Sequence, residues 1–295
     1  MKQHWNEQEL SEHWVLTTGE LQHIRNRTVR NRIGFAATLK FFMLAGRFPL
    51  NKSEIPRIAL EHLANQLDIN PESISDYKFS GRSYERDRSQ IREIVGFRPA
   101  TQYDAIRLTT WMEKEIIPID HRQDYLRDAA LDWCRNNRIE PPATTRLDRV
   151  IGSAMNNFQN KLFSNAFESI PLPCRVAMDR LLESTDNGNN SSDIDRTLMA
   201  ELRSDPGRPS LESVLTEIGK LNTVAAIGLP DHMFESISAK VLHKYRLRAS
   251  TEPPRELRRH PEAIRYTLLA AFCYQRKKEI IGVTSPLVKY CKLSL

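Results

Sequence analysis

The side chains with the clearest chemistry in this sequence are arginines and lysines that gather where acids are absent. No Asp or Glu occurs between Glu20 and Glu54, although basic residues recur throughout that interval. Guanidinium and ammonium groups attract polyanions, of which nucleic acid is the commonest. The pattern predicts a DNA-binding surface, and a solvated basic face is the competing interpretation. The candidate contacts in this stretch are Arg25, Arg27, Arg30, Arg32 and Arg47.

A second basic stretch lies at residues 78–98. Ser83 is a candidate N-cap, and Ile91, Ile94 and Val95 supply a narrow apolar edge for the helix that follows it. A short helix, a turn and an arginine-rich helix form the arrangement of a helix-turn-helix reader, whose second helix enters the major groove. The candidate contacts here are Lys78, Arg82, Arg86, Arg88 and Arg92.

Individual roles follow from the geometry of base and phosphate recognition. Arg86 is suited to a bidentate contact with guanine and Arg82 to a phosphate contact. Glu85, Asp87 and Glu93 are interleaved with these arginines, so a salt-bridged solvent face is the alternative. If Arg86 and Arg88 touch base edges, we expect each to contribute about 1–3 kcal/mol to specific binding.

A third basic stretch spans residues 244–265, where seven basic residues stand against three acidic ones. The same electrostatic argument makes it a second DNA-binding patch. Its candidate contacts are Lys244, Arg246, Arg248, Arg255, Arg258 and Arg259.

The sequence gives no sign of chemistry beyond charge. It contains no GxxxxGKS phosphate loop, no GxGxxG turn and no GxSxG elbow. The eight histidines never stand at HExxH spacing, and the four cysteines are too widely spaced for CxxC pairs. We therefore predict no catalytic residue, no metal site and no cofactor.

Helices must position the basic residues, because the hydrophobic spacing is helical throughout. The clearest case is the buried helix of residues 33–44, where Ile33, Ala37 and Phe41 fall on one face and Gly46 is placed to end the helix. No convincing alternating strand occurs. The predicted fold class is all-α.

Length and punctuation suggest how the chain is divided. Its 295 residues are enough for about two domains, and the Pro-Pro pair at 141–142 is the best boundary candidate. We expect a first DNA-binding helical domain over 1–139, a second over 140–260, and the start of a further helical region over 261–295. The lack of a signal sequence and of any run of about 20 apolar residues predicts a cytoplasmic protein without membrane contact.

Several stretches together carry a family likeness. NRIGFAATLKFFMLAGRFP resembles the N-terminal block of class II replicative (Tn-three-type) transposases. SGRSYERDRSQIREIVGFRP looks like the arginine-rich helix of that family, and IEPPATTRLDRVIGSAM and RSDPGRPSLESVLTEIGKLNTVAAIGLP are similar to its later blocks. The likeness is collinear from about residue 8 to residue 280.

The resemblance implies a helical N-terminal region with two DNA-binding domains that recognise the terminal inverted repeats of a transposon. In the family, the ribonuclease H-like domain with its three acids and magnesium lies far downstream, so no cleavage is expected from this chain. The implied partners are double-stranded DNA and possibly a second copy or a full-length transposase. The alternative function is a helical regulatory protein that pairs with full-length transposase through residues 262–281. The tail IGVTSPLVKYCKLSL departs from the family pattern.

Overall fold

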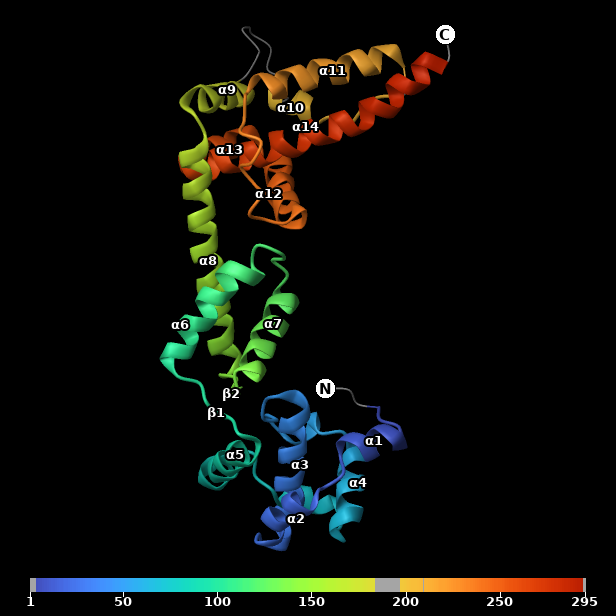
Figure 1. The fold of residues 1–295 in the computed structure, drawn as a ribbon, viewed down its shortest axis with the longest axis vertical. Helices are drawn as coiled ribbons and strands as arrows, with labels where there is room; N and C mark the ends of the chain where they lie inside the picture. The colour runs from blue at the N-terminus through green and yellow to red at the C-terminus, as the bar shows by residue number, and fades with distance from the viewer. Residues whose placement is uncertain (1–3, 184–196, 209, 294–295) are drawn as a thin grey trace. The chain divides into compact units, whose positions relative to one another are not determined.

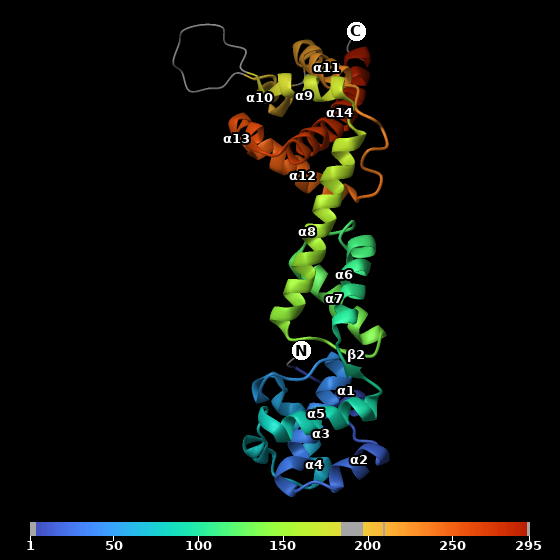
Figure 2. The ribbon, with the colours of Figure 1, turned by 90° about the vertical axis from the view of Figure 1, so that its left-hand side faces the viewer.

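The computed structural model describes residues 4–183, 197–208 and 210–293; for Arg30 and residues 283–293 it describes the backbone alone. The predicted polar loop at 184–193 lies outside the described residues. Within them the chain is helical, and the strand pairing is a two-residue parallel bridge between β1 (Arg98–Pro99) and β2 (Ile139–Glu140). The all-α prediction is confirmed (Figures 1 and 2).

The chain divides into two compact units. The first comprises Met1–Leu108 and Arg127–Ile151, and the second comprises Thr109–Leu126 and Gly152–Leu295. These bounds differ from a division at the Pro-Pro pair, because three helices, α6 (Gln102–Trp111), α7 (Gln123–Asn136) and α8 (Thr144–Ser169), cross from one range into the next.

The first unit is built around one buried helix. Its helical segments are α1 (Glu7–His13), α2 (Thr18–Arg25), α3 (Val29–Ala45), η1 (Lys52–Glu54), α4 (Arg57–Leu67), η2 (Pro71–Asp76) and α5 (Gly81–Val95). The side chains of Phe35, Leu39 and Phe41 in α3 are fully buried. Gly46 adopts a left-handed φ of 68° and donates its N–H to the carbonyl of Phe42, which ends the helix as predicted.

Two local predictions need correction. The arginine-rich helix α5 begins at Gly81 and its N-cap is Ser80, so the assignment of Ser83 as N-cap is wrong. The reason is that Gly81, at φ 84°, makes the turn that an L-residue rarely adopts, and the helix starts there. The segment before it, η2, is a 3₁₀-helix and not an α-helix.

The second unit surrounds another buried helix. Its helices after α8 are α9 (Leu172–Leu182), α10 (Leu198–Arg203), α11 (Leu211–Ala226), α12 (Ala239–Thr251), α13 (Pro254–Arg259) and α14 (Glu262–Leu293). Residues 266–273 of α14 are all buried, because α11 and α12 pack along this helix (Figure 1). The hypothesis that residues 262–281 offer a partner-binding surface is therefore wrong for this face, which is core.

None of the helices in the described part of the chain combines the length and the hydrophobicity needed to cross a membrane.

Candidate nucleic-acid interface

The helix α5 is oriented by a polar and an aromatic anchor on its inner face. Tyr84, Asp87 and Ile91 are spaced at three and four residues, and all three are buried. Tyr84 donates its hydroxyl to the carbonyl of Pro49 at 2.9 Å. This inner face fixes which side of α5 points to solvent.

Asp87 is the centre of the first anchor. It is buried, forms an ion pair with Arg27, and accepts a hydrogen bond from the hydroxyl of Tyr77 at 2.8 Å. Arg27 also reaches Gln90 at 2.6 Å and lies 3.4 Å from the ring centroid of Phe35. Burial and the charge of Asp87 raise the pKa of Tyr77, so its hydroxyl remains a donor. Arg27 is thus committed to the interior.

Glu140 is the second anchor, and it binds two candidate DNA contacts. This carboxylate is buried at the end of β2; one oxygen pairs with Arg88, and the other accepts from Arg92 at 2.6 Å. Arg88 also meets Glu85 at 2.8 Å. Burial opposes the charged form of Arg88, but the bond to Glu140 holds its pKa above the ordinary value. Both arginines therefore cross-link α5 to the chain after α7.

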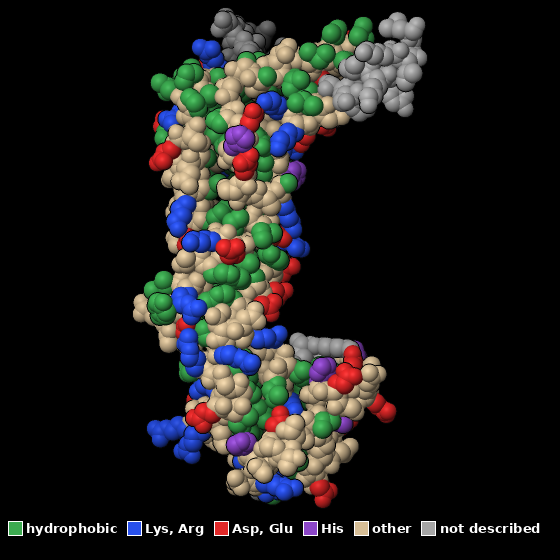
Figure 3. All heavy atoms as spheres, viewed as in Figure 1, with side chains coloured by type: hydrophobic (Ala, Val, Ile, Leu, Met, Phe, Trp, Pro, Cys, Tyr) green, Lys and Arg blue, Asp and Glu red, His purple; other side chains and the backbone are tan. Residues whose placement is uncertain are grey.

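The remaining basic residues of this helix face outward. Lys78, Arg82 and Arg86 are exposed, and none of them forms an ion pair with a described residue. Arg82 and Arg86 are one helical turn apart, so they project from the same side of α5. Figure 3 shows lysine and arginine side chains projecting beside α5. These three residues are the part of the predicted site that is available to a polyanion.

The acid-free stretch around α3 finds its acids elsewhere in the fold. Arg47 pairs with Glu54 at 2.7 Å. Arg32 donates to the backbone carbonyls of Arg27 and Arg25, each at 3.1 Å. Arg25 is exposed and has no ion-pair partner among the described residues, whereas the side chain of Arg30 lies outside them. The stretch is therefore less free than its composition indicates.

The second unit divides its basic residues in the same way. Arg246 pairs with Glu279 at 2.6 Å, Arg248 with Glu252 at 2.5 Å, and Arg259 with Glu256 at 2.9 Å. The second group is exposed and forms no ion pair with a described residue; it consists of Lys244, Arg255 and Arg258. The short helix α13, opened by Pro254, carries Arg255 and Arg258.

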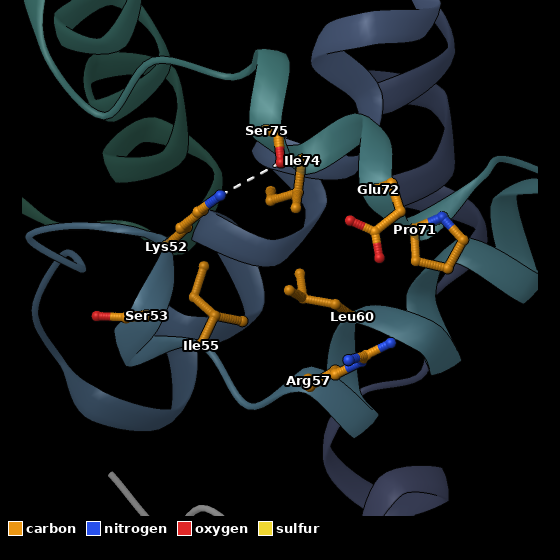
Figure 4. Close-up of a pocket in the computed structure, with 9 residues that line it drawn as sticks. All are labelled: Lys52, Ser53, Ile55, Arg57, Leu60, Pro71, Glu72, Ile74 and Ser75. Atoms are coloured by element: carbon orange, nitrogen blue, oxygen red, sulfur yellow. Dashed lines mark hydrogen bonds between the residues drawn. The ribbon is translucent and has the colours of Figure 1, made fainter.

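A pocket of about 440 Å³ in the first unit adds cations that the predicted site omitted (Figure 4). It lies among η1, α4 and η2, and Lys52, Arg57 and Glu72 are its charged lining residues. Lys52 donates to the hydroxyl of Ser75 at 3.3 Å. The signal for Lys52 was its place in the acid-free stretch. The lining lacks a nucleophile paired with a base, so the pocket is not built as a hydrolytic site.

Among the described residues, no group of three or more His, Cys, Asp or Glu side chains is placed to hold a metal ion. The buried carboxylates near the basic residues are instead saturated by guanidinium partners. Thr101 and Asp104 form the predicted capping box, at 3.0 Å and 3.2 Å, and Arg98 binds Asp104 at 2.6 Å. These bonds hold the pKa of Asp104 well below its usual range.

Comparison with known proteins places this architecture. Residues 1–154, more than half of the chain, match the family model described as "Domain of unknown function (DUF4158)". The chain belongs to the DUF4158 family. It is also 24% identical over 261 residues to the transposase for transposon Tn1546 of Enterococcus faecium and 25% identical over 265 residues to that for Tn21 of Escherichia coli. The predicted resemblance to replicative transposases is confirmed.

Coverage of these relatives is one-sided. The alignments include 87% and 89% of this DUF4158 chain but 25% and 26% of the two transposases. The transposase for Tn501 of Pseudomonas aeruginosa matches at 23% identity over 94% of the chain and 27% of its own length. The chain thus spans about a quarter of the length of the curated relatives it matches.

Proposed function

We propose that the chain binds double-stranded DNA sequence-specifically, at the terminal inverted repeats of a transposon. The observation that carries this proposal is the outward set of α5. Lys78, Arg82 and Arg86 are exposed without ion-pair partners among the described residues, on a helix whose other arginines are tied to buried carboxylates. The relatives named transposases supply the biological setting.

In this proposal α5 is the reading helix of a helix-turn-helix arrangement, with α4 before it and η2 in the connection. Its first turns carry Arg82 and Arg86, and reading helices place their N-terminal residues against base edges. Arg86 reads guanine and Arg82 holds phosphate, because a guanidinium can bond guanine N7 and O6 together. The anchors at Asp87 and Glu140 fix the angle at which the helix presents these groups.

A second DNA contact comes from the exposed cations Lys244, Arg255 and Arg258 of the second unit. We assign the two sets to the proposed DNA-binding domains at 1–139 and 140–260. Two linked modules that bind one duplex raise the effective concentration of each other, so their joint affinity exceeds either alone. DNA binding, and not strand cleavage, is the proposed contribution of this chain to transposition.

The test is a gel-shift titration with a duplex that carries the terminal repeat of a transposon against a scrambled duplex of the same composition. We expect a preference of at least tenfold for the repeat near ~150 mM salt, since specific sites exceed non-specific DNA by far more. Equal affinity for the two duplexes would refute sequence specificity.

A further inference from the structure

The outer face of α11 is unusually poor in charge for an exposed helix. The helix has 16 residues, and its charged residues are Glu212, Glu217 and Lys220. Glu217 and Lys220 are buried and pair with each other at 2.6 Å. The exposed side instead carries Leu211 and Leu215, 68% and 60% exposed, and Figure 3 shows hydrophobic side chains along this helix.

These apolar residues form one stripe. At 3.6 residues per turn, Leu211, Leu215, Ile218 and Ala225 fall within an arc of about 80°. The opposite side of α11 already packs on α14, so the stripe is not needed for the core of the unit. A helix that is apolar on both sides buries the second side against another chain more often than it leaves it in water.

A groove opens where the stripe ends. It has a volume of about 300 Å³, and its apolar lining includes Ala225, Leu229 and Tyr274. Lys277 and Lys278 also line it; Lys278 is exposed, and its ammonium donates to the hydroxyl of Tyr274 at 3.0 Å. Ala225 belongs to both the groove and the stripe, so the two form one surface.

The surface is complementary to itself. Leu211, a protruding apolar side chain, and Ala225, at the groove, are 14 residues apart, or about 21 Å along the helix, with Ile218 at the midpoint. If a second α11 lies antiparallel across the first, Leu211 of each copy meets the groove of the other and Ile218 meets Ile218. The same overlap brings Glu212 of one copy toward Lys278 of the other, which pairs opposite charges at both ends.

We propose that the outer face of α11 binds a second copy of this chain in a two-fold, antiparallel arrangement. The occupant is a second copy because the knob and the acid lie at one end of the helix and the groove and the lysine at the other, which is the condition for an isologous contact. A 16-residue helix is about 24 Å long, so the face buries less than the ~800 Å² per partner of a standard interface. The dimer is therefore of micromolar affinity.

Sedimentation velocity of the whole chain over a concentration series measures this dimer. We expect a concentration-dependent shift from monomer to dimer in the wild type, and monomer alone for Leu215→Glu. Leu172→Glu is the matched control, since Leu172 is 69% exposed on α9 but is not part of the stripe; it should dimerise like the wild type. A wild type that stays monomeric at the highest concentration, or a Leu215→Glu variant that still dimerises, overturns the proposal.

A charge reversal tests the register. Glu212→Lys and Lys278→Glu should each weaken dimerisation, by about tenfold when both symmetric contacts are lost. The double variant restores the opposite charges in exchanged positions and should recover most of the affinity. A double variant as weak as the single ones contradicts the antiparallel register, provided that thermal melts show all three variants folded.

Discussion

Single arginines of α5 are expected to act in different ways, according to the carboxylates they meet. Arg86→Ala should cost about 1–3 kcal/mol of specific DNA binding, because it removes a proposed base contact. Its melting temperature should match that of the wild type, since Arg86 forms no ion pair with a described residue. A titration with repeat DNA measures the first effect and a thermal melt measures the second.

Arg88→Ala should show the reverse pattern. It leaves the buried carboxylate of Glu140 with Arg92 alone, and loss of a partner to a buried charge costs about 1–3 kcal/mol of stability. The earlier expectation that Arg88 touches base edges thus gives way to a structural role. An exposed arginine on α8 without an ion pair among the described residues, Arg149, provides the control; Arg149→Ala should change neither stability nor specificity.

His121 makes the stability of the second unit sensitive to acid. Its ring packs against Phe158 and Tyr245, with Lys244 and Asp120 as the charged neighbours. Burial, followed by the charge of Lys244, lowers the pKa of His121 from 6.5 to about 4. Between these values the unfolded chain binds a proton that the folded chain does not, so the free energy of unfolding decreases as the pH falls from 6.5 to 4.

The variant His121→Phe keeps the aromatic contacts and removes this titration. We expect its melting temperature to fall less than that of the wild type between about pH 7 and about pH 5. Melts at the two pH values, compared between the two proteins, cancel the carboxylates that titrate in both. An identical acid response would show that the imidazole is not buried in neutral form.

At the scale of elements, α3 is held to η2 by the absence of a side chain. A Cβ added to Gly34 would lie 2.0 Å from the ring of Tyr77, the residue that also donates to Asp87. Gly34→Ala should therefore destabilise the protein by about 1–3 kcal/mol, as overpacking does. Gly152→Ala on α8 is the control, because nothing lies within 4 Å of its added Cβ; it should stabilise by about 0.5–1 kcal/mol. Chemical denaturation measures both changes, and a neutral Gly34→Ala would contradict the packing of η2 on α3.

The helices themselves could be predicted from the sequence, and their pairing could not. Hydrophobic spacing is local, so it located α3, α4 and α8 and the glycine that ends α3. The state of each arginine depends on residues far along the chain: Asp87 lies 60 residues from Arg27, and Glu140 lies 52 from Arg88. No local pattern reports such contacts. For that reason the sequence treated as one basic surface a set of side chains that the fold divides into paired and exposed groups.

At the scale of the whole molecule, each compact unit of this DUF4158 chain presents its own small set of exposed cations. Lys78, Arg82 and Arg86 form the set on α5, and Lys244, Arg255 and Arg258 form the other. Because phosphate contacts dominate protein–DNA affinity, the number of these residues that touch DNA determines how steeply binding falls with salt. The relation applies whichever sequence the protein prefers.

The most direct measurement is therefore the slope of log affinity against log salt for repeat DNA. Replacement of Lys78, Arg82 and Arg86 together by Gln should reduce that slope by about 2–3, since each lost contact changes it by roughly 0.9. The double variant Arg88→Gln, Arg92→Gln should keep the wild-type slope if it remains folded, because Glu140 already neutralises both guanidiniums. An unchanged slope in the triple variant, or a reduced one in the folded double variant, would contradict the assignment of the outward face of α5 to DNA.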